Sequence, residues 1–383
     1  MSVTAPAGFR AAGVTAGIKE SGQPDLAVVI NDGPSDAAAG VFTTNRVKAA
    51  PVLWTQQVVQ GGRVRAVVLN SGGANACTGP GGFGDTHHTA ERLGKEISVS
   101  AGEIAVCSTG LIGERLPMDK LLRGVDAAVA AASADGGAAA ADAIRTTDTV
   151  PKMCHMPGPG YVIGGMAKGA AMLAPALATM LAVVTTDADL AAAELDAALR
   201  EAVAVTFDRL DTDGCMSTND TVLLLASGVS GVRPDPGEFA ELLTEGCADL
   251  ARQMQLDAEG AGKAIVIEVT GAASEADAVT VGRAIARCNL LKCAIGGEDP
   301  NWGRVLAAVG TTDAVFEPDR LGVAINGVWV CRSGYAAEDR AGVDLSPRDV
   351  IITVDLAAGA RSAVIRTTDL TAAYVHENSA YST

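Results

Sequence analysis

Short apolar runs alternate along this chain with longer segments of helical periodicity. Residues 65–70 form an apolar run that leads into a loop rich in Gly and Asn, and "EIAVCSTGLIG" (103–113) is a second run that ends in a glycine turn. Such short runs bounded by turn residues are typical of buried strands. Three later segments, at residues 263–272, 349–356 and 362–370, predict further strands for the same reason.

Helices are predicted where apolar residues recur at helical spacing. We expect them at residues 85–97, 117–137, 189–206, 237–257 and 274–288. Pro117 suits the first turn of the second of these helices, and the glycine pair at 136–137 marks its end. Ser274 and Asp277 form a capping-box pattern at the start of the last one. The Ala- and Gly-rich tract at 126–143 is interpreted as a solvated helix end and loop.

The strongest local signal is a hairpin in "GVAINGVWV" (322–330), where two β runs flank Asn326-Gly327. This dipeptide is typical of a type I′ turn. Strands and helices are interleaved without strict alternation, which predicts an α+β fold with substantial antiparallel pairing rather than a doubly wound sheet. "GPGYVIGG" (158–165) is not a dinucleotide-binding motif, because its glycines lack the required spacing between a strand and a helix.

The composition and net charge of the chain restrict the kinds of molecule that it can bind. The chain has 383 residues, enough for two or more structural units, and a formal net charge of −16. Nucleic-acid binding needs a clustered basic face, whereas the basic groups here, such as "RVRAVV" and "RAIARC", are short and interrupted. We therefore expect no nucleic-acid partner.

The start of the chain and its cysteines predict a compartment. The first residues lack a basic segment followed by an apolar core, and the longest apolar stretch, 169–184, contains Pro175. We expect no targeting peptide and no membrane span. The eight cysteines include no C-x-x-C pair, and the four histidines have no zinc-like spacing to them. These features predict reduced thiols, a cytoplasmic protein and no metal site.

One hydroxyl stands out in the apolar segment "PALATMLAVVTTD" (175–187), namely that of Thr179. One interpretation is a packed residue near the start of a helix, whose hydroxyl bonds to a backbone carbonyl. The other is chemical. A mid-chain threonine has no adjacent base, but an N-terminal threonine carries an α-amine that can take its proton. A chemical role therefore requires cleavage between Ala178 and Thr179.

Two neighbouring features bear on this choice. Lys168 lies in the apolar segment "MAKGAAML", where a cation needs a partner. "STG", from Ser108 to Gly110, is a strand-to-loop turn whose backbone N–H groups are suited to holding an oxyanion. Both features favour chemistry without excluding a structural role.

Eight motifs together resemble the ornithine acetyltransferase (glutamate N-acetyltransferase) family of arginine biosynthesis. The resemblance runs from about residue 40 to the C-terminus. The motifs are "VLNSGGANACTG", "CSTGLIGERLPM", "TTDTVPK", "AKGAAMLAPALATML", "DTDGCMSTNDT", "DAEGAGK", "GEDPNWGR" and "HENSAYST". The resemblance implies a layered α/β sandwich with largely antiparallel or mixed sheets, of the type shared by ornithine acetyltransferases and self-processing aminopeptidases.

The resemblance also implies an activity. The chain would cleave itself between Ala178 and Thr179 into an α subunit (1–178) and a β subunit (179–383), which assemble as α2β2 or larger. Thr179 would accept the acetyl group of N-acetylornithine, release ornithine and pass the acetyl group to glutamate. No cofactor is implied, although acetyl-CoA is a further candidate donor. A self-processing aminopeptidase or amidase of the same fold is the alternative enzyme, and an uncleaved binding protein is the alternative of another class.

Three residues receive the central roles by this resemblance. Thr109, through its hydroxyl, and Gly110, through its backbone N–H, would stabilise the tetrahedral oxyanion. Lys168 would pair with the α-carboxylate that both substrates carry. Taken alone, Lys168 would instead be interpreted as a surface lysine with a partly covered stem.

The remaining predicted substrate-binding residues are spread along the chain. Thr146 and Thr147 would lie on the α-subunit side, and Asn378 and Thr383 would bring the C-terminal tail to the substrate. Glu259 would recognise an ammonium group or orient the Thr179 amine. Taken alone, Glu259 is typical of a loop or cap carboxylate, and the tail residues of a frayed end.

Two motifs are interpreted as structural, and two positions depart from the family pattern. Trp302 is expected to be half-buried in a turn, with Arg304 near the site, and residues 211–221 to form a polar network rather than a calcium loop. Ala176 stands where asparagine is frequent, and Ser382 where threonine is expected. These departures affect local hydrogen bonding and leave the predicted reaction unchanged.

Overall fold

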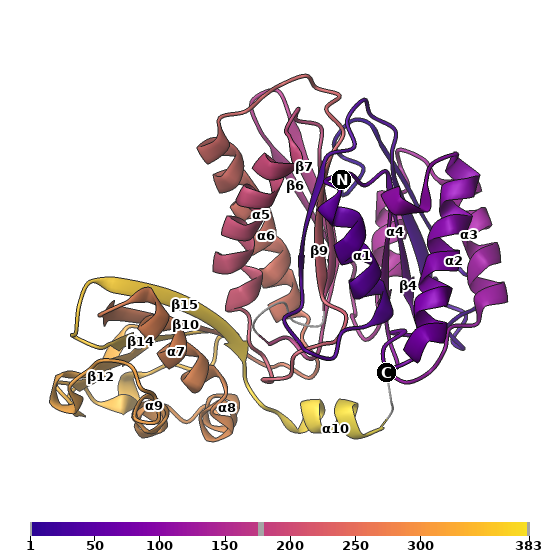
Figure 1. Ribbon diagram of the computed structural model, residues 1–383. Helices are drawn as coiled ribbons and strands as arrows, with labels where there is room; N and C mark the ends of the chain where they lie inside the picture. The colour runs from indigo at the N-terminus through magenta and orange to yellow at the C-terminus, as the bar shows by residue number, and fades with distance from the viewer. Residues whose placement is uncertain (1, 175–179, 381–383) are drawn as a thin grey trace. The chain divides into compact units, whose positions relative to one another are not determined.

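The computed structural model describes residues 2–174 and 180–380, which form two compact units. The first unit contains residues up to 208 together with 215–254. The second contains 209–214 and the chain from 255 onward. The unit boundary therefore falls after the predicted cleavage bond, which lies outside the described residues (Figure 1).

Two mixed sheets build the first unit. The first has the order β1-β2-β4-β5, with β1 Phe9–Val14, β2 Leu26–Asn31, β4 Ala66–Ser71 and β5 Ile104–Thr109. The second has the order β3-β9-β8-β7-β6, with β3 Ala38–Phe42, β9 Thr221–Ala226, β8 Leu181–Thr186, β7 Val162–Lys168 and β6 Lys152–Pro157. The β4–β5 and β8–β9 ladders are parallel, and the other ladders of these two sheets are antiparallel.

Helices complete the layers of this unit (Figure 1). They are α1 Ala50–Gln60, α2 Gly79–Ile97, α3 Met118–Ala131, α4 Gly137–Ala143, α5 Ala192–Val205 and α6 Pro236–Leu256. Apolar residues of α2 and α3 pack on one face of the first sheet, whose other face packs toward the second sheet. Strands β2, β4, β5, β8 and β9 are buried along their whole length, which explains their continuous apolar runs. The predicted layered fold with mixed sheets is confirmed.

The Ala- and Gly-rich tract corrects one prediction. Helix α3 ends at Ala131, and the tract continues into α4, whose Ala140 and Ala141 are completely buried between the sheets. The glycine pair therefore begins a helix instead of ending one. A Cβ at Gly136 would lie 1.7 Å from the carbonyl oxygen of Ala11 in β1, so the close approach of chain and strand requires glycine. The alanine-rich segment that forms α4 therefore packs in the core and is not a solvated helix end.

The apolar run after Thr179 is also corrected. A helix was considered there, but Leu181–Thr186 is strand β8, fully buried between β7 and β9. A short apolar run does not distinguish a buried strand from a helix, and the strands on either side decide the matter here. Helix α2 likewise begins at Gly79, earlier than predicted.

The second unit is one sheet covered by helices. Its order is β13-β12-β11-β14-β10-β15, with β13 Tyr335–Ala336, β12 Val328–Arg332, β11 Gly322–Ile325, β14 Asp349–Asp355, β10 Ala264–Ala272 and β15 Arg361–Thr368. The helices of this unit are α7 Glu275–Ala286, α8 Asn289–Gly296, α9 Trp302–Val309 and α10 Ala372–Ala380. Alternate residues of β14 are buried, as expected for a sheet with one covered face. The hairpin is confirmed, with positive φ at Asn326 and Gly327, as is the cap by Ser274.

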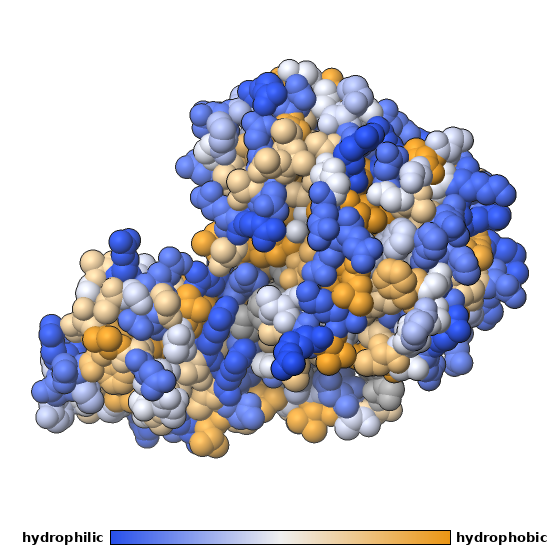
Figure 2. All heavy atoms as spheres, in the orientation of Figure 1, coloured by the Kyte–Doolittle hydropathy of each residue, from blue (hydrophilic) through white to orange (hydrophobic). Residues whose placement is uncertain are grey.

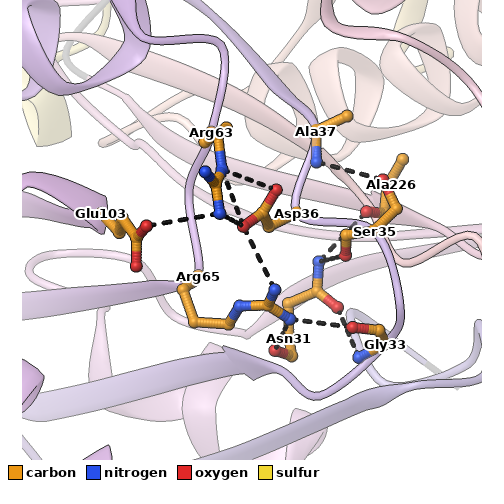
Figure 3. Close-up of polar contacts among 9 residues, drawn as sticks. All are labelled: Asn31, Gly33, Ser35, Asp36, Ala37, Arg63, Arg65, Glu103 and Ala226. Carbon is orange, nitrogen blue, oxygen red and sulfur yellow. Dashed lines mark hydrogen bonds and ion pairs between the residues drawn. The ribbon is translucent and has the colours of Figure 1, made fainter. Parts of the chain in front are cut away.

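A cluster of ion pairs and hydrogen bonds links the two sheets of the first unit at one end (Figure 3). Arg63 and Arg65 donate to Asp36 over 2.8 and 3.1 Å, and Arg65 also donates to the Asn31 carbonyl at the end of β2. The Asn31 amide donates to the Ala226 carbonyl at the end of β9. Burial alone would raise the pKa of Asp36, but the two arginines lower it. By strand register, this end is opposite the one where β5 and β7 finish.

On the face shown in Figure 2, polar residues cover much of the surface, and apolar residues are scattered among them. Exposed large apolar side chains, such as Ile112, Val205 and Leu290, come from separate elements. Across the part of the chain that the structure describes, no helix is long and apolar enough to cross a membrane.

Candidate active site

The candidate site lies in the first unit, where β5 and β7 end and β8 begins. Thr109 is the last residue of β5, and Lys168 is the last residue of β7. Lys168 pairs in register with Leu181, the first residue of β8. Strand topology therefore brings together residues that are far apart in the sequence, and two of the predicted site residues meet here.

Thr109 and Gly110 form a tight turn against the loop after β4. The N–H groups of Gly72 and Gly73 both donate to the Thr109 carbonyl over 2.9 Å. Gly110 has φ of +129°, and a Cβ at this position would lie 2.5 Å from the Gly73 nitrogen. Only glycine fits this conformation and this close approach. The backbone of the predicted oxyanion turn therefore requires glycine at position 110.

Lys168 is buried rather than a surface lysine, with 2% exposure. Its Nζ donates to the Thr109 hydroxyl oxygen over 3.4 Å. A hydroxyl group has one proton and two lone pairs, so a donor on the oxygen leaves the Thr109 proton available for another acceptor. The ammonium group and the hydroxyl therefore lie close enough to contact two anionic groups of one bound molecule.

Asp148 connects the groups around Lys168. Its Oδ1 accepts hydrogen bonds from Lys152 Nζ and from the Gly169 N–H, each over 2.6 Å. Its Oδ2 accepts from the Thr146 N–H over 3.1 Å and lies 3.9 Å from Lys168 Nζ. One buried carboxylate thus orders two of the predicted substrate-binding positions, Thr146 and Lys168.

The ionisation of Asp148 gives a prediction about acid stability. Burial alone would raise its pKa, but Lys168 and Lys152, with the Lys152 and Gly169 hydrogen bonds, lower the pKa from 3.8 to about 2. A lowered folded-state pKa stabilises the fold above the unfolded-state value, and this stabilisation is lost as the pH falls through the folded-state value. The contribution is about 2 kcal/mol and should disappear between about pH 4 and about pH 2.

Denaturant unfolding at several pH values checks this expectation. The difference in unfolding free energy between the wild type and Asp148→Asn/Lys152→Met should shrink by about 2 kcal/mol over that interval. A constant difference from neutral pH to about pH 2 would contradict the ionised, paired state of Asp148.

Asn219 and Asp220, from the part of the polar segment 211–221 that belongs to the first unit, contact the backbone around the site. The Asn219 amide donates to the carbonyls of Ala74 and Ser108 over 2.7 and 2.8 Å, which fixes the oxyanion turn to the loop after β4. Asp220 Oδ1 accepts from the Met180 N–H over 3.1 Å. Burial raises the pKa of Asp220 well above its usual value, although the Met180 N–H and the charge of Lys168 oppose this shift. A buried carboxyl group with a raised pKa therefore contacts Met180, the residue that follows Thr179 in the sequence.

Thr147, next to Thr146, also lies in the first unit, and the other predicted residues fall in the second unit or outside the described residues. Glu259 lies in the turn before β10 and accepts a hydrogen bond from the Asn378 amide in α10 over 2.9 Å. Trp302 is half-buried, as expected, but begins helix α9, and Arg304 donates to the Leu290 carbonyl in α8. Outside the described residues lie Ala176, Ala178, Thr179, Ser382 and Thr383.

The motif "TTDTVPK" contains two functional candidates that the sequence reasoning missed, Asp148 and Lys152. Only the threonines of the motif were considered, although an acid and a base four residues apart beside them are a visible signal. Among the described residues, no group of three or more His, Cys, Asp or Glu side chains is arranged to hold a metal ion. The described site contains hydroxyl, amide, ammonium and carboxylate groups.

This arrangement fits the class of enzymes that stabilise an oxyanion during acyl transfer. A family model described as the ArgJ family matches residues 10–383, so the chain belongs to the ArgJ family. The family match confirms the relationship predicted from the eight motifs, and with it an acyltransferase of arginine biosynthesis.

Individual relatives show the same relationship. The arginine biosynthesis bifunctional protein ArgJ of Thermobifida fusca is 72% identical over 100% of both chains, and that of Streptomyces coelicolor is 67% identical over 100% of both. A crystal structure of ornithine acetyltransferase complexed with ornithine, from Mycobacterium tuberculosis, is 59% identical. It covers 47% of this chain and 96% of that chain, with a TM-score of 0.43.

Proposed function

We propose that this chain transfers the acetyl group of N-acetylornithine to glutamate through an acetyl ester on Thr179. The observation that carries the proposal is the buried contact between Lys168 and Thr109 beside the ionised Asp148. This contact places a cation for a substrate carboxylate beside a hydroxyl donor for the oxyanion, which acyl transfer requires. Membership of the ArgJ family supports the choice of substrates.

The reaction begins with cleavage of the chain. Hydrolysis of the Ala178–Thr179 peptide bond consumes one water and leaves a free α-amine on Thr179. This amine has an ordinary pKa of about 8, so roughly a tenth of it is unprotonated at pH 7 and can act as a base. An internal threonine has no such base. We infer that cleavage and catalysis therefore use the same residue.

The transfer cycle then has two symmetrical halves. As the Thr179 hydroxyl attacks the acetyl carbonyl, the amine takes its proton and later gives it to the departing nitrogen of ornithine. Thr109 and Gly110 donate to the oxyanion of each tetrahedral intermediate. The amine of glutamate attacks the resulting ester, and N-acetylglutamate leaves as the threonine hydroxyl is restored. Lys168 binds the α-carboxylate of each substrate in turn.

Five further assignments remain predictions in this proposal. Thr146, Thr147, Glu259, Asn378 and Thr383 would contact the substrates. The α2β2 or larger assembly and the cytoplasmic location are likewise proposed. Relatives carry the name "bifunctional", which supports acetyl-CoA as a second acetyl donor for glutamate.

An assay with N-acetylornithine distinguishes transfer from hydrolysis. The proposal predicts ornithine release that depends on glutamate and yields N-acetylglutamate in equal amount. Release of acetate at the same rate with and without glutamate would instead indicate the alternative, a self-processing amidase. Repeating the assay with acetyl-CoA as the donor tests the second activity.

Cleavage is expected to leave the two fragments associated. A cut before Thr179 would assign β3, β6 and β7 to the first fragment and β8 and β9 to the second. In one sheet, β9 and β8 of the second fragment lie between β3 and β7 of the first, and β7 pairs with β8 and β3 with β9 along most of their lengths. Separation would expose two buried ladders with unsatisfied backbone groups, at a cost well above the stability of a typical domain interface.

Native size-exclusion chromatography followed by a denaturing gel checks this prediction. The two fragments should elute together in buffer, at the volume of an uncut Thr179→Ala chain, and separate only in denaturant. Separate elution in buffer would show that the shared sheet does not hold them.

A further inference from the structure

The direction of the Gly110 N–H is set by the loop after β4. The Thr109 carbonyl, which belongs to the same peptide group, accepts the N–H groups of Gly72 and Gly73. The C=O and the N–H of one trans peptide point in opposite directions, so these bonds aim the Gly110 N–H away from the loop. No hydrogen bond of the described residues has this N–H as its donor. The loop therefore keeps one donor of the oxyanion turn directed outward and unused.

One side chain, that of Asn219, bonds to both the turn and the loop. Its Nδ2 donates to the Ser108 carbonyl over 2.8 Å and to the Ala74 carbonyl over 2.7 Å, which uses both amide protons. Its Oδ1 accepts the Thr218 hydroxyl over 2.6 Å, and only 5% of the residue is exposed. Partners on the nitrogen and on the oxygen fix the orientation of this buried amide.

The two residues after Asn219 bond to Met180, which follows Thr179 in the sequence. The Thr221 N–H donates to the Met180 carbonyl over 3.2 Å, and Asp220 Oδ1 accepts the Met180 N–H over 3.1 Å. The same short segment thus bonds to the oxyanion turn on one side and to the backbone next to the proposed nucleophile on the other.

The relative placement of these two parts matters for acyl transfer. A donor stabilises an oxyanion only when it lies at hydrogen-bond distance from the oxygen that becomes charged. A displacement of about 1 Å in an active site can lower the rate about a hundredfold. A residue that holds the turn beside the nucleophile-bearing segment can therefore affect the rate without contacting substrate.

We propose that Asn219 is a positioning residue, which holds the oxyanion turn in place relative to Met180 and so relative to the nucleophile that precedes it. This inference rests on the proposed function. It adds a residue of the 179–383 fragment to an oxyanion site whose two donors belong to the 1–178 fragment. Asn219 acts through the Ser108 and Ala74 carbonyls, so its contribution is to bond formation rather than to substrate binding.

The variant Asn219→Ala tests this role, because it removes both amide donors. We expect the kcat of glutamate-dependent transfer to fall about tenfold to hundredfold, since the oxyanion donors shift but remain present. The KM values for N-acetylornithine and for glutamate should stay within about threefold of the wild type. Rates are expressed per cleaved enzyme, with the amount of the 179–383 fragment measured on a denaturing gel.

Asn31→Ala is the matched control. Asn31 is completely buried at the opposite end of the two sheets, and its Nδ2 also donates to two carbonyls, those of Ser35 and Ala226, each over 3.1 Å. Both variants should have a lower melting temperature, because each loses two hydrogen bonds to the backbone. Only Asn219→Ala should lose kcat. Cleavage slowed in Asn219→Ala but not in Asn31→Ala would support the same role during self-processing.

A double variant tests whether Asn219 acts through the turn. In Thr109→Val one oxyanion donor is already absent, so Asn219→Ala should lower kcat by a smaller factor there than in the wild type. Two factors that simply multiply would contradict action through the turn.

Asn219→Ser is the alternative where Asn219→Ala fails to fold. Serine keeps a hydroxyl donor on a shorter side chain, and its kcat should fall about tenfold. A folded and cleaved Asn219 variant whose kcat is lowered no more than that of Asn31→Ala would overturn the inference alone. A wild-type enzyme without glutamate-dependent transfer would overturn the proposed function instead.

Discussion

A chain that carries Thr179→Ala is expected to remain a single polypeptide and to transfer no acetyl group. The substitution removes both the acyl acceptor and, because cleavage fails, the α-amine that serves as its base. Loss of an activated nucleophile typically costs at least about 10⁴-fold in rate, so residual transfer should be undetectable. A denaturing gel and intact-mass measurement report cleavage, and the glutamate-dependent assay reports transfer.

Thr179→Ser provides the matched control for this variant. Serine keeps a hydroxyl and, after cleavage, an α-amine in the same place. We expect two fragments, the second beginning at residue 179, with measurable transfer. A Thr179→Ala chain that still divides between residues 178 and 179 would contradict the role of this hydroxyl in cleavage.

Thr109→Val is expected to have the second largest effect. Valine keeps the shape and β-branching of threonine but removes the hydroxyl donor to the oxyanion. Loss of one such donor lowers kcat by about 10²- to 10³-fold, or about 3 to 4 kcal/mol. The Thr109→Val chain should still fold. Position 109 is only 4% exposed, and its carbonyl still accepts the Gly72 and Gly73 N–H groups.

Two comparisons separate a catalytic effect from a structural one. Thr109→Ser keeps the hydroxyl and should retain kcat within about tenfold of the wild type. Thr185→Val removes a buried hydroxyl in β8 that donates to the Val3 carbonyl over 2.8 Å, so it should lower stability without lowering kcat. A Thr109→Val variant with the wild-type kcat would show that Thr109 does not donate to the oxyanion. If the same turn serves cleavage, fragment formation should slow in parallel.

Parts of the fold with a local signal could be predicted from the sequence. The Asn326-Gly327 turn requires positive φ at both residues, and Ser274 caps α7 through its own side chain, so each signal lies within a few residues. Elements determined by distant partners could not be predicted in this way. The 181–186 run becomes a strand because β7 and β9 flank it, and α4 is buried because Gly136 lets it approach β1.

The residues of the candidate site also divide into those with a local sequence signal and those that depend on distant partners. Thr109, Gly110 and Lys168 could be identified from short motifs, and the contact of Thr109 with Lys168 follows the prediction that a buried lysine needs a polar partner. The Asp148–Lys152 pair was visible as an acid and a base four residues apart, but its importance depends on the contact of Asp148 with Lys168, which the sequence does not reveal. The Glu259–Asn378 hydrogen bond joins residues 119 positions apart, which spacing alone does not reveal.

Intact-mass measurement of the cleaved protein tests most directly whether the acetyl group passes through the Thr179 hydroxyl. Incubation with N-acetylornithine alone should add the mass of one acetyl group to the 179–383 fragment and none to the 1–178 fragment. Addition of glutamate should remove that mass and produce N-acetylglutamate. An unmodified 179–383 fragment, trapped rapidly during active turnover, would contradict the acetyl-threonine intermediate.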